Sequence, residues 1–458
     1  MDLSNMFYVL ASVLFILGIK KLSHPKTARN GNSLAATGML IAIVSTLLYF
    51  GNIDFQLVAL GIIIGAIIGG VFAIKVEMTQ MPQMVAIFNG FGGSASALVA
   101  AAEFLNSGDI TTFTMSTIVI SIFIGTLTFT GSFIAFGKLQ GFISGQPIVF
   151  PGQQVFNGIL GLALITVGVL TVIEPNNIDA FYITIIISAL LGVTLTIPIG
   201  GADMPVIISL LNSYSGIAAA ATGFVLMNNG LIIAGALVGA SGIILTSIMC
   251  KGMNRSLANV IFGAMGLEQD PGTDSDGSQK QVNIKSYSTE EAAMIFDAAD
   301  KVIVVPGYGL AVAQAQHAVR EVAEFLEKSG KKVLYAIHPV AGRMPGHMNV
   351  LLAEANIDYE QLKDLDEINP EFEDCDVTLV LGANDVVNPA ARHDTSSPIF
   401  GMPILDVDKS RTVIINKRTM NTGFAGIQNE LFGYDNSIMV FGDAKDMLQQ
   451  LLKDLKDL

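Results

Sequence analysis

Polar side chains inside otherwise apolar stretches form a first group that could do chemistry. They are Asn89, the run NSYS at 212–215, and Asp203 in GGADMP. Ionisable and amide side chains are costly inside a membrane and are therefore functional candidates. Asn89, Asn212 and Asp203 could line a path for water and protons. Two simpler readings stay open: buried polar residues often serve helix packing, and Asp203 could be a plain loop acid or a helix N-cap.

A second group follows the apolar run KVIVV at 301–305. Gly307 and Gly309, in PGYG, can form a tight turn that places a phosphate at the start of a helix. The third position of a Gly-x-Gly-x-x-Gly motif is Val312, so the motif alone is weak and a purely structural turn is the alternative. The strand–turn–helix context favours a dinucleotide site.

Later residues indicate which dinucleotide would bind. The second strand ends at His338 without the acidic residue that usually binds the ribose of NAD. Lys417 and Arg418 follow the strand TVIIN and suit a 2′-phosphate, although a solvated charge pair is the alternative. Arg343 lies in a Gly/Pro-rich loop that could clamp a pyrophosphate. Asp385 comes just after the third strand, where such sheets bind ligands, although a loop aspartate can also be a plain turn former.

Composition divides the chain into two regions. Of 458 residues, 51% are hydrophobic and 14% charged, which excludes a soluble globular enzyme and a disordered scaffold. Residues 1–255 carry eight basic and eight acidic residues, so the net charge of −14 lies in the last 203 residues and makes nucleic acid an unfavourable partner. Cys250 and Cys375 are far apart and the five histidines form no tight cluster, so we expect no metal site.

The first region contains stretches long enough to cross a bilayer. We expect about nine transmembrane helices, at 3–19, 32–50, 53–74, 82–104, 113–136, 154–173, 179–198, 205–227 and 230–250. Every basic residue of this region then falls on one side, which the positive-inside rule makes cytoplasmic. These residues are Lys20, Lys21, Lys26, Arg29, Lys75, Lys138, Lys251 and Arg255. The N-terminus is expected outside and the C-terminal domain in the cytoplasm.

The second region alternates strand and helix patterns. We expect a polytopic all-α membrane domain over 1–255, a linker or hinge over 256–287, and a Rossmann-like α/β domain with a parallel sheet over 288–458. The expected strands are 301–305, 333–337, 377–381, 403–407, 412–416 and 438–441, and the expected helices are 311–328, 349–356, 424–431 and 444–456. Ser288 and Glu291 could form a capping box that opens a short helix.

Long strings along the whole chain resemble the β subunit of the proton-translocating NAD(P) transhydrogenases. They include KVEMTQMP (75–82), FTGSFIAFGKL (129–139), LNSYSG (211–216), PGYGLAVAQAQ (306–316), GANDVVNPA (382–390) and KRTMNTGFAG (417–426). The resemblance implies the reaction NADPH + NAD⁺ ⇌ NADP⁺ + NADH, with direct hydride transfer coupled to proton translocation. It also implies that the C-terminal domain binds NADP(H).

The resemblance assigns site residues in several loops. The implied NADP(H) positions are Gly307, Tyr308, Gly309, Val340, Ala341, Gly342, Arg343, Met344, Pro345, Gly382, Ala383, Asn384, Asp385, Val386, Gly401, Met402, Lys417, Arg418, Thr419, Met420, Asn421, Thr422, Gly423, Phe424, Asp443 and Ala444. Asp385 is expected near the nicotinamide. Asn89, Asn212 and Asp203 are expected in proton coupling.

Partners and location follow from the same resemblance. It implies an α subunit that carries the NAD(H) domain and further membrane helices, a dimer of αβ units, and the plasma membrane of a bacterium. Two positions depart from other family members: Asn89 replaces a histidine found in some, and Phe424 stands where others can have tyrosine. A channel or transporter gated by a nucleotide-binding domain is the competing class. The lack of a potassium-type filter and of basic residues inside the helices counts against it.

Overall fold

The computed structural model forms two compact units, each described by itself. One comprises Met1–Thr246 with Val260–Met265, and the other Ser247–Asn259 with Gly266–Leu458. The structure describes residues 3–23, 25–49, 54–106, 110–201, 203–262, 284–344, 346–423 and 425–458. Pro345, Phe424 and most of the expected linker lie outside these residues.

The first unit is all-helical. Within the part of the chain that the structure describes, nine helices are long and apolar enough to span a membrane, which confirms the expected architecture. They are α1 (Leu3–Leu22), α2 (Pro25–Tyr49), α3 (Phe55–Lys75), α4 (Met81–Asn106), α5 (Thr112–Gln140), α6 (Gln153–Ile173), α7 (Ile178–Thr196), α8 (Met204–Val225) and α9 (Asn229–Gly252).

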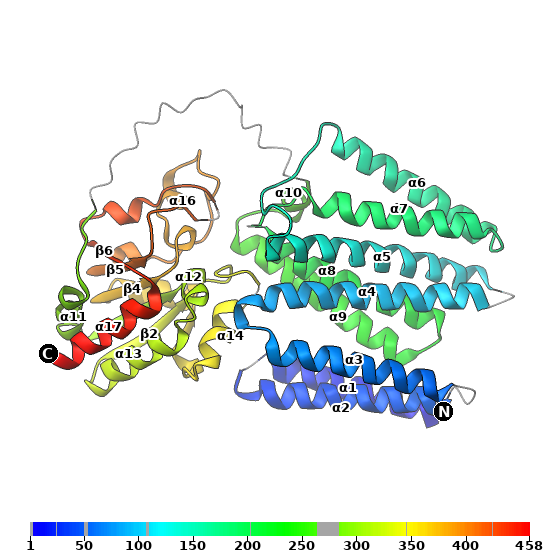
Figure 1. The fold of residues 1–458 in the computed structure, drawn as a ribbon, viewed down its shortest axis with the longest axis horizontal. Coiled ribbons are helices and arrows are strands. Elements are labelled where there is room, and N and C mark those ends of the chain that lie inside the picture. Colours follow the sequence, from blue (N-terminus) through cyan, green and yellow to red (C-terminus); the bar gives the residue numbers. More distant parts are fainter. Residues whose placement is uncertain are drawn as a thin grey trace. The chain divides into compact units, whose positions relative to one another are not determined.

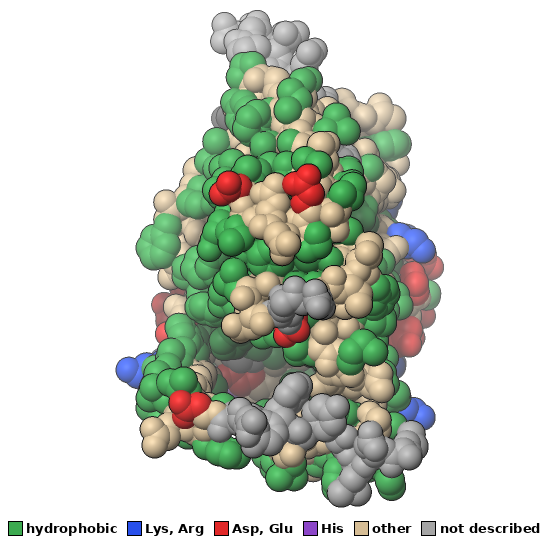
Figure 2. Space-filling model, turned by 90° about the vertical axis from the view of Figure 1, so that its right-hand side faces the viewer, with side chains coloured by type: hydrophobic (Ala, Val, Ile, Leu, Met, Phe, Trp, Pro, Cys, Tyr) green, Lys and Arg blue, Asp and Glu red, His purple; other side chains and the backbone are tan. Residues whose placement is uncertain are grey.

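Successive helices of this unit run in opposite directions (Figure 1). Basic residues stand in the last turns of α1, α3, α5 and α9, so they gather at one end of the helices. The face at the other helix ends, shown in Figure 2, carries acidic side chains among hydrophobic ones, with basic side chains only at its rim. This separation is the charge pattern from which the orientation was predicted.

Small residues bring the central helices into close contact. A Cβ built on Gly93 of α4 would lie 2.7 Å from the carbonyl oxygen of Gly125 in α5, so the two backbones touch there. Gly216 of α8 packs in the same way against Gly239 of α9. Lipid offers no hydrophobic drive for helix association, so such close packing supplies much of the attraction. By contrast, no residue of α3 is buried, and Gly65 of α3 faces open space.

The second unit is built on a six-stranded parallel sheet in the order β3-β2-β1-β4-β5-β6. The strands are β1 (Lys301–Pro306), β2 (Lys332–Ile337), β3 (Leu362–Asp364), β4 (Val377–Leu381), β5 (Thr412–Lys417) and β6 (Ser437–Phe441). This is the doubly wound order of dinucleotide-binding folds, with a switch point between β1 and β4. The predicted Rossmann-like class is therefore confirmed.

Helices and loops cover the two faces of the sheet. The helices α11 (Thr289–Asp297), α13 (Gln316–Lys328) and α17 (Ala444–Asp457) pack together beside the strands (Figure 1). Alternate strand residues, such as Ile303 and Val305, enter a separate core with Phe372 and Leu405. Ser288 and Glu291 form the predicted capping box at the start of α11.

Three predictions of elements were wrong. Residues 403–407 do not form a strand, because their apolar side chains are buried in a loop that Asn369 holds. The side-chain amide of Asn369 donates to Ile404 O and accepts from Asp406 N. The described part of 424–431 is not an α-helix, since Gly426 has a φ of 72°. The expected helix 311–328 breaks at Gln314 into α12 (Tyr308–Val312) and α13. The short strand β3 was not predicted.

Gly125→Leu should destabilise the helical unit. Its Cβ would meet the α4 backbone, and overpacking of this kind costs about 1–3 kcal/mol or more. The thermal midpoint of the purified protein in detergent should fall. Gly158→Leu on α6 is the matched control, because that glycine faces open space. Equal midpoints for the two variants would contradict the close contact of α4 and α5.

Candidate functional site

The candidate nucleotide residues come together at one edge of the sheet. All strands are parallel, so their carboxyl ends lie at the same edge, where sheets of this order bind ligands. The loops after β1, β2, β4, β5 and β6 start there, and they hold Tyr308, the 340–344 loop, 382–386, 417–423 and Asp443. Gly401 and Met402 join them from the chain before β5, where Met402 belongs to a buried cluster against which Val386 and Ala425 pack.

The two turns at the switch point touch main chain to main chain. Gly307 N donates to Leu381 O at 2.9 Å, and Gly309 N donates to Gly382 O at 3.0 Å. A Cβ on Gly309 would lie 2.6 Å from the Cα of Gly382, which itself has a φ of 64°. This packing by itself accounts for both glycines of PGYG, as the structural-turn alternative required. A nucleotide role for them rests on their place at the switch point.

The missing third glycine has a structural explanation. In a Gly-x-Gly-x-x-Gly motif the last glycine allows the helix to pack closely on the sheet. Here Val312 ends the five-residue helix α12 and its side chain is exposed, so it does not face the sheet. Valine is therefore compatible with this turn.

The loop after β2 closes over the turn after β1. The guanidinium carbon of Arg343 lies 4.6 Å from the centre of the Tyr308 ring, and Arg343 N donates to His347 Nδ1 at 3.0 Å. Burial raises the pKa of Tyr308, while the charge of Arg343 acts against that shift. The loop's Ala341 and Met344 are buried. The predicted clamp residue Arg343 is thus placed beside the predicted Tyr308.

His338 joins two of the candidate loops. Its Nε2 lies 2.7 Å from Pro403 O, and its Nδ1 accepts a hydrogen bond from Val340 N at 3.2 Å. These partners require a neutral ring with the proton on Nε2. Burial lowers the pKa of His338 to about 4, against the opposing effect of the bond to Pro403. The sequence showed His338 only as a non-acidic strand end.

Asp385 anchors the loop that follows β5. Its carboxylate accepts from Ala425 N at 3.0 Å and from Asn384 Nδ2 at 2.9 Å. A Cβ on Gly423 would lie 2.5 Å from the same carboxylate, so only glycine fits there without displacement. Asn429 Nδ2 donates to Asn384 O at 2.9 Å. The 417–423 loop, which carries several candidate residues, therefore ends on Asp385.

The two candidate phosphate cations differ in their surroundings. Lys417 Nζ donates to Asn384 Oδ1 at 3.0 Å and to Asn421 O at 2.8 Å, and burial lowers its pKa while Asp385 acts to raise it. Arg418 is exposed, as are the following candidates 419–422. Lys417 thus ties the loop to its base, and Arg418 offers the exposed guanidinium.

Asp443 caps α17 by accepting from Lys445 N, and Ala444 is buried behind it.

In the helical unit, Asn89 bonds directly to α8. Its Nδ2 donates to Ile208 O at 3.1 Å, one helical turn before Asn212, whose side chain is half-buried. Ser213 faces the other way and donates to Gly239 O of α9 at 2.7 Å. Asp203 is buried at the start of α8 without capping that helix through its side chain. Asp203 therefore stands at the N-cap position, as the simpler reading required, but its carboxylate makes no capping hydrogen bond to α8.

Several buried polar groups near Asn89 were not predicted. Ser121 of α5 and Thr222 of α8 have their hydroxyl oxygens 2.7 Å apart, and each can donate to Ser96 O of α4. Gln83 Oε1 and Ser132 Oγ are buried and have no hydrogen-bond partner among the residues that the structure describes. Single serines and glutamines in apolar helices are common, so their sequence signal is weak. Only the packing of α4, α5 and α8 shows that they meet.

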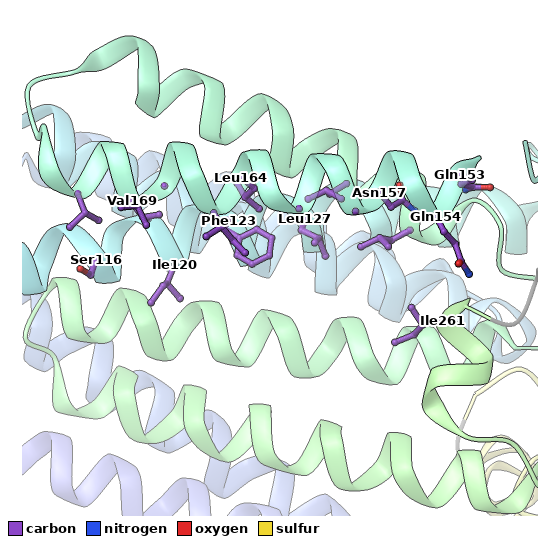
Figure 3. Close-up of a pocket in the computed structure, with 18 of the residues that line it drawn as sticks. Ser116, Ile120, Phe123, Leu127, Gln153, Gln154, Asn157, Leu164, Val169 and Ile261 are labelled. Atoms are coloured by element: carbon purple, nitrogen blue, oxygen red, sulfur yellow. The ribbon is translucent and has the colours of Figure 1, made fainter. Parts of the chain in front are cut away.

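A large cavity lies elsewhere in the helical unit. It has a volume of about 810 Å³ and is lined by α5, α6 and α7, with mostly apolar side chains such as Phe123 and Leu164 and with Gln153 and Asn157 towards one end (Figure 3). None of the candidate residues lines it. Across the described residues, no group of three or more histidine, cysteine or carboxylate side chains could hold a metal ion.

Comparison with known proteins decides the family. The family model for the NAD(P) transhydrogenase beta subunit matches residues 4–454. The chain belongs to the NAD(P) transhydrogenase beta-subunit family. Two relatives named NAD(P) transhydrogenase subunit beta, one from Rhodospirillum rubrum and one from a named strain of that species, are each 52% identical over 454 residues, covering 97% of this chain and 97% of their own. Membership gives the chain an oxidoreductase role, in a multi-pass membrane protein.

Lowering the pH should destabilise the C-terminal unit through His338. Because its folded pKa of about 4 is below its ordinary 6.5, the unfolded chain binds a proton between these values that the folded chain does not. Stability is then lost as the pH falls from 6.5 to 4, by up to about 3 kcal/mol. Urea unfolding of residues 284–458 measures this loss. His338→Gln should flatten the dependence, whereas the exposed His317→Gln should not.

Proposed function

We propose that this chain binds NADP(H) through its C-terminal unit and couples hydride exchange with NAD(H) to proton movement through its helices. The reaction would be NADPH + NAD⁺ ⇌ NADP⁺ + NADH. The observation that carries the proposal is the convergence of five candidate loops on the switch-point edge of the sheet. Hydride passes between two nicotinamides in this chemistry, so the chain's own task is to bind, orient and shield its nucleotide.

The loops at that edge fit NADP(H) in their chemistry. Arg418 offers an exposed guanidinium for a 2′-phosphate, and Arg343 in the loop over Tyr308 can bind a pyrophosphate. His338, a buried neutral ring, directly follows the strand β2, where NAD-binding folds usually have an acid. Asp385 and the 417–423 loop would close over the nucleotide, with Asp385 on the nicotinamide side.

Proton coupling would use the polar contact between α4 and α8. Asn89 bonds to the α8 backbone one turn from Asn212, and Asp203 is buried where α8 begins. An asparagine does not titrate, so Asn89 would orient water rather than carry the proton. The titrating group would then come from a helix of the partner subunit.

Partner and location complete the proposal. The chain would work with an α subunit that carries the NAD(H) domain and further membrane helices, in a dimer of αβ units. The clustering of basic residues at one end of the helices supports a cytoplasmic location for that end, with the N-terminus outside. The membrane would be the plasma membrane of a bacterium. The stereochemistry would be that of the Re/Si-specific transhydrogenases.

NADP(H) should bind to the C-terminal unit at least tenfold more tightly than NAD(H). A charge-assisted hydrogen bond to phosphate contributes about 1.5–3 kcal/mol, so Arg418→Ala should remove most of the preference. Lys417→Ala should weaken both nucleotides, because Lys417 holds the loop itself. Calorimetry measures each affinity. Arg411→Ala, at the opposite end of β5 and highly exposed, is the control. Equal affinities in the unmutated protein would refute the assignment.

Asp203→Asn should lower proton pumping and NADPH formation together in the assembled enzyme, while NADP(H) affinity of the C-terminal unit stays unchanged. Asn89→Ala should act in the same direction more mildly, because it removes only the bond to Ile208 O. Proton uptake into vesicles, recorded alongside hydride transfer, tests both. Normal pumping by Asp203→Asn would place the proton path elsewhere.

A further inference from the structure

Lys138, which the sequence analysis counted only among the basic residues of the cytoplasmic side, is a buried cation. It lies in the last turn of α5 and only 5% of its surface is exposed. Its ammonium donates to three main-chain oxygens: Gln146 O at 3.1 Å, Ile197 O at 2.6 Å and Ile199 O at 2.8 Å. An ammonium has three N–H groups, so all its donors are used. No ion pair within the described residues includes Lys138.

The three oxygens belong to two segments that are separate in sequence. Gln146 lies in the loop after α5, whereas Ile197 and Ile199 directly follow Thr196, the last residue of α7. Carbonyls at a helix C-terminus lack partners within the helix and carry partial negative charge. The lysine supplies both the donors and the opposite charge, which is what allows a lone ammonium to be buried here.

Other bonds tie the same two segments. Gly201 N donates to Gly145 O at 2.8 Å, and Ile148 N donates to Ile197 O at 3.3 Å. Beside them, Gln153, at the start of α6 in Figure 3, donates to Thr194 O in the last turn of α7 at 2.9 Å. These are neutral contacts, and charge-assisted bonds are about twice as strong. Lys138 is therefore the strongest single link between the loop and the chain that leads into α8.

That chain leads directly to Asp203. The segment 197–201 connects the end of α7 to the start of α8, and Asp203 stands two residues after Gly201. We propose that Lys138 is a positioning residue, whose three carbonyl bonds fix segment 197–201 and thereby hold Asp203 in place for coupling. The part of this inference that concerns coupling rests on the proposed function.

The structural claim can be tested without any enzyme activity. Gly200→Cys places a thiol on the segment, where its Cβ makes only an ordinary contact with Pro147 at 3.5 Å. In the full-length protein in detergent, Lys138→Met should speed maleimide labelling of this thiol at least tenfold, and Lys138→Arg should keep it within threefold of the parent. A thiol introduced by Asn176→Cys, exposed at the other end of α7, should be unaffected. An unchanged rate for Gly200→Cys would overturn the proposal.

The functional claim needs the assembled enzyme in vesicles. Lys138→Met should lower the proton uptake per hydride at least fivefold, while uncoupled hydride transfer and NADP(H) affinity stay within twofold. Lys138→Arg should restore at least half of the coupling. Lys75→Met, which removes an exposed cation at the end of α3, is the matched control and should change nothing.

The outcomes separate the two proposals. A parallel loss of coupled and uncoupled activity that arginine does not restore would make Lys138 merely structural and overturn the inference. If labelling accelerates while coupling stays normal, Lys138 does not act on Asp203. If the unmutated enzyme moves no protons at all, the proposed function fails, and with it the coupling role of Lys138. Should Lys138→Met not fold, Lys138→Gln, which keeps a donor, replaces it in both tests with the same expectations.

Discussion

The hydrocarbon interior of a bilayer offers no hydrogen bonds, and most of the helical unit follows from that constraint. Every backbone polar group there must find its partner within protein, and a buried side chain can supply it. Ser213 bonds Gly239 O, Asn89 bonds Ile208 O, and Lys138 bonds three carbonyls, so in each case a side chain meets the backbone of another segment. Ser213 can reach Gly239 O because glycines such as Gly216 of α8 and Gly239 of α9 let those two backbones approach. Packing by small residues and polar bonding are thus two parts of one arrangement.

The outer surface of the C-terminal unit faces water, and its interior is built on a parallel sheet whose geometry determines where the loops start. The switch point between β1 and β4 sends their following turns in opposite directions, and Gly309 against Gly382 closes the gap between them. The remaining loops are then held by side chains: Asn384 and Asp385 hold the loop after β5, and Asn369 holds the chain before it. Asparagine and aspartate suit this task because they bond to nearby main chain.

Much of this architecture was predictable from sequence. Nine apolar stretches, the alternation of strands and helices and the capping box at Ser288 are local patterns, and each is found in the structure. Long strings such as GANDVVNPA also gave the family. Failures occurred where tertiary contacts override the local pattern. The apolar run at 403–407 is a buried loop because Asn369 and Val386 supply its hydrogen bonds.

Lys138 shows the same limit for a site. From its charge alone, Lys138 is interpreted as a loop residue. Nothing near it in the sequence indicates that it bonds to the carbonyls of Ile197 and Ile199, about sixty positions away. The roles of the nucleotide residues could be expected only through family resemblance. No local rule predicts that Gly423 must be small because the carboxylate of Asp385 lies against it.

The two bonds of His338 have a consequence for how a ligand would enter. One ring nitrogen bonds the loop after β2 and the other bonds the chain before β5, so neither loop can move far without breaking a buried hydrogen bond. The two loops are therefore expected to move together. A molecule that orders one of them orders the other at the same time, and the entropy lost on binding is shared between them rather than incurred twice. Separation of the two loops on this side of the site then requires that a buried hydrogen bond of the His338 imidazole be broken.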